Sequence, residues 1–188
     1  VRSRGLGDVY KRQGESLDLL NEFYVVKPDA SAEYMNKQLA SGKHLLITPG
    51  MYELSEPLHV THPNTIILGI GWATLIPGEK NSDTAILVED VDGVTIASLM
   101  FDAHYTSNTL IQVGTEKTAQ RHIQNPILLT DLFFRIGGFR PAKVHVDRAV
   151  ELNSNDVIGD HFWIWRADHG VRGSVGWEIN TTRNGLVI

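Results

Sequence analysis

Residues 160–170, DHFWIWRADHG, combine residue types that could perform acid–base chemistry on a polymer. Hydrolysis of a glycosidic bond uses two carboxyl groups, one as general acid and the other as nucleophile or base. Asp160 and Asp168 are candidates for these roles. Asp131 falls at the corresponding bend of the preceding repeat, so the carboxylates of Asp131 and Asp160 would lie roughly 5–7 Å apart on adjacent strands. The alternative is that both aspartates are turn residues bonded to their own backbone.

The same stretch holds side chains that could bind a sugar. Trp165 stands near the end of its run, where an indole face could form a platform for a sugar ring. Arg166, Asp168 and His169 lie in the following turn, which ends at Gly170. Loops on a rigid scaffold are where binding and catalysis concentrate. These side chains could hold sugar hydroxyl groups or supply a general acid, and the alternative is a turn stabilised by ion pairs.

Two further residues, Asp102 and Arg135, occupy one outward position on neighbouring repeats, where they could pair and contact substrate. A surface ion pair is the other interpretation. His161 is predicted to face the interior as a hydrogen-bonded core residue. No second histidine stands at ligand spacing with a carboxylate on the same face, so the sequence predicts no metal site. Nothing in it indicates a cofactor.

The composition argues against several classes of protein. The chain has 188 residues, a net charge of −5 and no cysteine, so it could form one domain with a sizeable core but no disulfide. Lysine and arginine form no run beyond residue 13, and nucleic-acid binding needs a clustered basic surface. No apolar segment approaches the ~20 residues of a membrane span.

The elements that must position these residues begin with one helix. Ser31 can cap it, Ala32, Met35 and Leu39 have helical spacing, and Gly42 can end it, which predicts an amphipathic helix at 31–41. After it, short β runs are broken by Gly, Pro, Asn and Asp.

Those β runs repeat. Four longer runs share a bend and a terminal aromatic residue, and each is followed by a shorter strand. The four pairs of run and strand are 64–78 with 84–90, 93–104 with 109–115, 126–138 with 148–154, and 155–170 with 176–182. Aligned on the bend, Trp72, Phe101, Phe134 and Trp163 are spaced by 29, 33 and 29 residues. Such periods are typical of a solenoid. The predicted fold is all-β: a right-handed, single-stranded parallel β-helix with an N-terminal capping α-helix.

The alignment also predicts which side chains point inward. Val94, Ile96, Leu99 and Phe101 would face the core, and the four aligned aromatic residues would stack in an interior row. The alternative for Trp163 is an exposed indole platform for a sugar ring. Outward positions between them fall to Met100, Phe133 and Phe162. An exposed apolar stripe of this kind usually has something that covers it, and an error of one residue would exchange the two faces.

The two ends differ from the rest of the chain. Residues 1–13 are basic and aperiodic and resemble translated adapter sequence, with a natural basic tail as the alternative. The chain stops in NGLVI, an apolar run typical of the start of a strand. We expect residues 14–188 to be the N-terminal part of a β-helix domain that is truncated at its C-terminus.

The segments GKHLLITPGMYELSEPLHV, ILGIGWATLIP, GVTIASLMFDA, DLFFRIGG and DVIGDHFWIWRADHG carry a family resemblance. Over roughly residues 22–188 the chain resembles secreted β-helix proteins of the pectate-lyase-like superfamily, and is similar to actinobacterial members related in style to family 55 glycoside hydrolases. The resemblance implies secretion, a polysaccharide substrate and, in the full-length protein, a second β-helix or a carbohydrate-binding module as partner.

Three functions are compatible with these observations. The first is a glycoside hydrolase that acts on a glucan-type polysaccharide lying along one face of the β-helix. The second is a polysaccharide lyase, which would use cationic groups to neutralise a uronate. The third is a glycan-binding or adhesin scaffold without catalysis, since a β-helix does not by itself specify a function.

Overall fold

The computed structural model describes residues 16–188, and within that range almost every regular element is a β-strand. The one helix is α2 (Ala32–Ala40), and the strands are β1 (Phe23–Val26), β2 (His44–Ile47), β3 (Gly50–Leu54), β4 (Leu58–Val60), β5 (Ile66–Gly69), β6 (Ala73–Pro77), β7 (Ile86–Val88), β8 (Thr95–Ala103), β9 (Ser107–Val113), β10 (Ile127–Ile136), β11 (Val144–Leu152), β12 (Val157–Arg166) and β13 (Asn180–Val187). The prediction about residues 1–13 lies outside the described residues.

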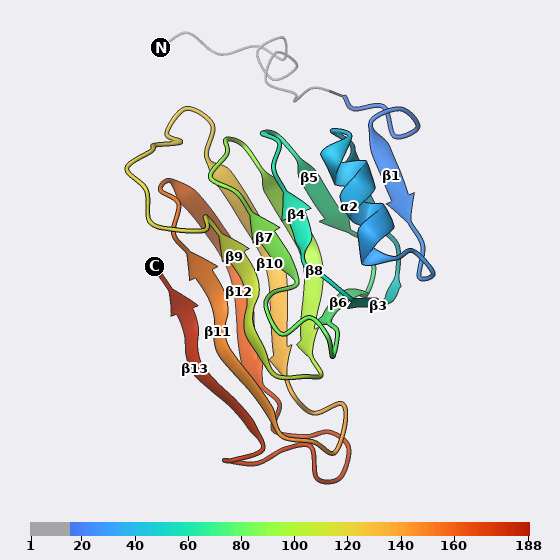
Figure 1. Cartoon of the computed structure of the whole chain (residues 1–188), viewed down its shortest axis with the longest axis vertical. Helices are drawn as coiled ribbons and strands as arrows, with labels where there is room; N and C mark the ends of the chain where they lie inside the picture. The colour runs from blue at the N-terminus through green and yellow to red at the C-terminus, as the bar shows by residue number, and fades with distance from the viewer. Residues whose placement is uncertain (1–15) are drawn as a thin grey trace, which may run out of the picture.

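The strands form two sheets that lie one behind the other (Figure 1). Sheet A has the order β1-β2-β5-β8-β10-β12, with β3 and β6 alongside, and sheet B has the order β13-β11-β9-β7-β4. From β7 onward, consecutive strands alternate between the sheets, and all their pairings are parallel. The chain therefore winds as a parallel β-helix, which confirms the predicted fold.

Helix α2 begins and ends where the sequence predicts. The Oγ of Ser31 accepts a hydrogen bond from the backbone N–H of Tyr34 at 3.2 Å, and Gly42, just beyond the helix, has a φ of 84°. Met35 and Leu39 are buried, and the helix contacts β1, β2 and β4 (Figure 1). Its apolar face thus covers the N-terminal end of the stacked coils.

Rows of inward side chains fill the space between the sheets. In sheet A, paired positions in successive coils form the row Tyr52, Leu75, Phe101, Phe134 and Ile164. The rings of Phe101 and Phe134 stack with 4.8 Å between centroids and 12° between planes. Val94, Ile96, Leu99 and Phe101 are all buried, as predicted.

The predicted interior row of four aromatic residues is wrong at both ends. Trp72 is 79% exposed and Trp163 is 61% exposed. In the first repeat, residues 70–72 form a bend between β5 and β6, so Leu75 rather than Trp72 pairs with Phe101.

In the last repeat the prediction is displaced by one residue. The residue at the bend has a left-handed backbone, with φ of 58° at Ser98, 53° at Asp131 and 55° at His161. Asp160 is therefore not at the bend and pairs with Thr130. The predicted sharing of one position by Asp131 and Asp160 is wrong.

This displacement exchanges the faces of the residues that follow the bend. Phe162 takes the inward position next to Leu132 and packs edge-on against Phe134 with 6.0 Å between centroids. His161 and Trp163 are exposed, contrary to the prediction. Placing Phe162 inward is favourable because a phenyl ring enters an apolar core without the desolvation cost of an imidazole.

The last predicted strand also begins later than expected. Residues 176–179 precede β13, with Trp177 in a turn and 89% exposed. The strand itself starts at Asn180 and includes most of the terminal apolar run.

Candidate functional site

Three rows of side chains cross the strands of sheet A at the bend and just after it, on the side of the sheet that faces away from the core. The bend row is Ser98, Asp131 and His161. The aromatic row is Met100, Phe133 and Trp163, and the arginine row is Asp102, Arg135 and Trp165. Because parallel pairing places equivalent residues of successive coils side by side, each row runs across the strands, along the axis of the β-helix.

A groove of about 540 Å³ lies over these rows. Its floor includes Met100, Phe133, Trp163 and Trp165, and Trp72 also lines it. The rings of Trp163 and Trp165 are 6.4 Å apart, and those of Phe133 and Trp163 are 6.3 Å apart. An aromatic surface of this size, with a few polar groups around it, has the character of a ligand site.

Asp131 lines the groove and contacts His161 from the next coil. Its Oδ1 is 2.5 Å from Nδ1 of His161, and both side chains are about half exposed or more. The imidazole also packs edge-on against Phe133, with 5.5 Å between centroids. The bend row therefore offers a carboxylate–imidazole pair directly beside the aromatic row.

Arg135 lines the opposite side of the groove, and Asp102 holds it there. The buried carboxylate of Asp102 accepts hydrogen bonds from Nε of Arg135 at 3.0 Å, from an Nη of the same guanidinium, and from Nε2 of His104 at 2.9 Å. Burial acts to raise the pKa of Asp102, but the hydrogen bonds from His104 and Arg135 outweigh it and hold this pKa below its usual range. The same hydrogen bond from Arg135 raises the pKa of its guanidinium.

The predicted pairing of Asp102 with Arg135 is thus confirmed, but it is not a surface ion pair. Asp102 is fully buried, and His104, which shares its carboxylate, stacks face to face on Phe139 with 3.8 Å between centroids. Removing one partner of such a pair leaves a buried charge uncompensated. Asp102 therefore positions Arg135 and does not itself line the groove.

The turn after β12 supplies the end of the groove. Asp168 and His169 both line it, with His169 Nδ1 2.6 Å from Asp168 Oδ1. The imidazole lies beside Trp165, with 5.4 Å between ring centroids. These three predicted site residues are therefore brought together, along with Asp131 and Arg135.

Two of the predicted site residues lie elsewhere. Arg166 points toward the turn before β13, where its Nε donates to the carbonyl of Asn180 at 2.7 Å and its guanidinium lies 5.8 Å from the ring of Trp177. Asp160 is exposed and is not among the residues that line the groove. Arg166 therefore has a structural role in this geometry, and Asp160 stands apart from the other aspartates.

Six residues of the site were not predicted as site residues from the sequence: Trp72 and Trp163, which were placed in the core, Met100 and Phe133, which were predicted only as part of an exposed apolar stripe, and Ser98 and His161. Asp and His are both enriched in left-handed conformation, so residue preference allows either Asp160 or His161 at the last bend, and only the alignment on His161 places Trp163 outward.

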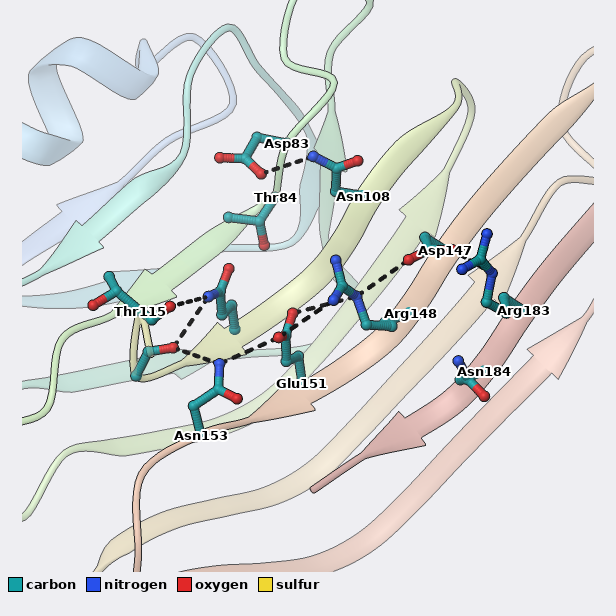
Figure 2. A network of polar contacts seen from close by, with 12 residues as sticks. Asp83, Thr84, Asn108, Thr115, Asp147, Arg148, Glu151, Asn153, Arg183 and Asn184 are labelled. Carbon is teal, nitrogen blue, oxygen red and sulfur yellow. Dashed lines mark hydrogen bonds and ion pairs between the residues drawn. The ribbon is translucent and has the colours of Figure 1, made fainter. Parts of the chain in front are cut away.

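The outer face of sheet B differs from that of sheet A. Its side chains form a network of polar contacts (Figure 2): Nε of Arg183 lies 2.9 Å from Asp147, and Nε of Arg148 lies 3.3 Å from Glu151. Asn153 donates to the same glutamate at 3.2 Å. Charged side chains that pair with one another suit a solvated surface, whereas the aromatic surface of sheet A suits a ligand.

Within residues 16–188, no cluster of three or more histidine or acidic side chains has an arrangement that could hold a metal ion. The described helix, α2, is too short to cross a membrane.

Comparison with known proteins places this chain among β-helix proteins. An exo-beta-1,3-glucanase of Streptomyces sp. SirexAA-E is 47% identical over 175 residues, which cover 93% of this chain and 28% of the glucanase. Two solved structures of sacteLam55A from the same organism, one of them a variant in complex with glucose, match with TM-scores of 0.82 and 0.79. They are 46% and 44% identical, and each match covers 89% of this chain.

The chain spans less than a third of the length of these relatives. Residues 23–188 match the model of the LAM55 pectate lyase-like domain, which is most of the sequence and includes all three rows of the groove. The chain therefore belongs to the LAM55 pectate lyase-like domain family.

Proposed function

We propose that this chain belongs to a glycoside hydrolase acting on β-1,3-glucan, and that it binds the glucan in the groove on sheet A. The observation that carries the proposal is the aromatic row between two polar rows. The similar glucanase and the glucose complex of sacteLam55A support a sugar as the ligand.

The groove matches the chemistry of a neutral sugar. A pyranose ring has apolar C–H faces and a rim of hydroxyl groups, so its face can stack on Phe133 and Trp163 while its rim reaches polar side chains. Asp131 and Arg135 supply such side chains on either side of the aromatic row. The charge of Arg135 is already paired with Asp102, which disfavours the uronate recognition that a lyase would need.

Asp131 and Asp168 are our candidates for acid–base roles. Each lines the groove and contacts a histidine, so a proton could be exchanged at the carboxylate while substrate lies on the aromatic row. Asp160 stays a prediction without this support, because it lies outside the lining of the groove. Trp165, Arg135 and His169 are proposed to contact the substrate, and Asp102 to act through Arg135.

Binding can be tested by titrating the protein with β-1,3-linked glucose oligosaccharides and following affinity by calorimetry. Trp163→Ala should weaken binding at least tenfold, because it removes the largest exposed ring of the floor. Trp177→Ala is the matched control, since Trp177 is more exposed than Trp163 but lies outside the groove. Equal affinities of wild type and Trp163→Ala would refute the proposed site.

Catalysis needs a separate measurement. If Asp131→Asn or Asp168→Asn abolishes reducing-sugar release from β-1,3-glucan but retains binding, that result would support a hydrolytic role for the substituted aspartate. Unsaturated product from uronate polymers would instead indicate a lyase. Binding without turnover in the wild type would indicate that this chain contributes a glycan-binding scaffold.

The setting of the protein belongs to the same proposal. A polysaccharide substrate suggests that the protein acts outside the cell, as its family resemblance also implies. Because the relatives are much longer than the matched segment, a second β-helix or a carbohydrate-binding module stays a predicted partner.

A further inference from the structure

The contact between Asp131 and His161 defines the hydrogen-bonding character of the bend row. Nδ1 of His161 lies 2.5 Å from Oδ1 of Asp131, and a carboxylate oxygen only accepts, so Nδ1 carries a hydrogen. In the neutral imidazole, Nε2 is then an acceptor. Among the described residues, no hydrogen bond occupies Nε2 of His161 or Oδ2 of Asp131. With the imidazole neutral, the pair therefore presents two free acceptors beside the aromatic row.

The backbone at this pair favours a functional role. Asp131 and His161 both have φ near 55°, a left-handed conformation that is unfavourable for most residues other than glycine. Glycine would form the same bend without that cost. Strained residues that cluster at a groove are a reason to look for a function, and here the strain holds two polar side chains at the edge of the floor.

The opposite side of the groove has the reverse character. A guanidinium carries five N–H donors and no acceptor. Asp102 occupies Nε and one Nη of Arg135, and the side chain of Arg135 is 28% exposed where it lines the groove. The remaining N–H groups of Arg135 can therefore only donate to a ligand.

We propose that these two sides fix the orientation of a sugar ring across the groove. Hydroxyl groups of the sugar donate to Asp131 and His161, and oxygens that can only accept, such as a glycosidic or ring oxygen, receive hydrogen bonds from Arg135. The ring itself stacks on Phe133 and Trp163. This inference rests on the proposed binding of a glucan in the groove, and it makes Asp131 and His161 specificity-determining residues.

Replacement of single hydroxyl groups by fluorine tests the orientation directly, because a C–F group cannot donate a hydrogen bond. The ligands are a β-1,3-linked glucose trisaccharide and its mono-deoxyfluoro analogues, with dissociation constants measured by ¹⁹F and ligand-observed NMR. At least one analogue should bind the wild type about tenfold more weakly than the parent, as expected for a lost hydrogen bond to a charged acceptor.

Two variants assign that loss to the pair. Asp131→Gly and His161→Gly both keep the left-handed bend and remove one acceptor each. At least one of them should bind the parent trisaccharide about tenfold more weakly than the wild type does. The same variant should bind the parent and the fluorinated analogue with dissociation constants within about twofold of each other. Asn64→Gly is the matched control, because Asn64 has a φ of 60° at a bend outside the groove, and it should retain the full discrimination.

The outcomes separate the two proposals. If the wild type binds the parent and Trp163→Ala does not, but no analogue is discriminated or discrimination persists in both glycine variants, the orientation is wrong while the groove stands. If the parent does not bind at all, or binds Trp163→Ala equally well, both the proposed function and this inference are overturned.

Discussion

Raising the pH above neutrality should loosen the loop at 114–126, between β9 and β10. The imidazole of His122 in this loop is fully buried, with Nδ1 2.6 Å from Asp92 and Nε2 2.9 Å from Asp90. Both acceptors are carboxylates, so both ring nitrogens must carry hydrogens and the ring must be an imidazolium. Loss of one proton would place a nitrogen lone pair against a carboxylate.

The direction of the effect follows from the pKa of His122. Burial acts to lower this pKa, but the hydrogen bonds to Asp90 and Asp92 outweigh it, so the pKa is raised above its ordinary value near 6.5. A raised folded-state pKa gives stability that is fully present below about pH 6.5 and is lost as the pH rises through the folded value. One hydrogen bond to a charged group is worth about 1.5–3 kcal/mol, which is the local stability we expect the loop to lose.

The neighbouring charges do not reverse this expectation. Asp156 accepts from the backbone N–H of His122 and from Arg121, and its pKa is lowered to about 2, chiefly by the hydrogen bond from Arg121. This second attachment therefore stays paired from acid to mildly alkaline pH. The loop should loosen at His122 rather than detach as a whole.

Hydrogen exchange can measure the change. Protection factors of amides in 114–126, corrected for the intrinsic pH dependence of exchange, should fall between pH 6 and pH 9 while those of Phe101 and Phe134 stay constant. His122→Gln should lower protection at pH 6 and remove the dependence, and His145→Gln, on the outer face of sheet B, should leave it unchanged. An ordinary pKa for His122 by NMR, or the same pH dependence in His122→Gln, would refute the reasoning.

Three other perturbations give simpler expectations. Phe134→Ala removes one ring of the stacked interior pair and should lower the free energy of unfolding by about 3–5 kcal/mol in chemical denaturation; a loss below 1 kcal/mol would contradict the stacked interior. Asp102→Asn should lower the free energy of unfolding by about 3–5 kcal/mol at pH 7. Because the folded pKa of Asp102 is lowered, this difference from wild type should shrink as the pH falls below about 4. Ser98→Gly relieves a positive φ and should raise the free energy of unfolding by about 1 kcal/mol, which would be seen as a higher thermal midpoint. A lower midpoint would show that the Ser98 side chain is needed at the bend.

The predictions that succeeded depend on patterns that repeat along the chain. Helix α2 was predictable because Ser31, Met35 and Leu39 stand at the spacings that capping and burial require. The β-helix was predictable because each repeat needs a neighbour to bury its apolar row, and a period of about 30 residues is typical of that arrangement. The pairing of Asp102 with Arg135 followed from the same alignment, in two repeats where it was correct.

The predictions that failed depend on single-residue differences between repeats. DVIGDHF aligns with LLTDLFF in two ways, one with Asp160 at the bend and one with His161 there, and local sequence does not distinguish them. The choice is made by packing: only the second places Phe162 against Phe134 and leaves His161 in water. Trp72 was misplaced for a similar reason: the bend at 70–72 puts Leu75 rather than Trp72 opposite Phe101.

Local spacing and backbone preference were enough to specify the repeat and the capping helix. Tertiary structure alone decided which face each residue of the last coil occupies, because a strand alternates its side chains and a one-residue shift moves all of them to the other face. That shift carries Trp163 from the core to the floor of the groove and brings His161 to Asp131. The candidate site therefore arises where the stacking of coils, rather than the repeat itself, settles the alignment.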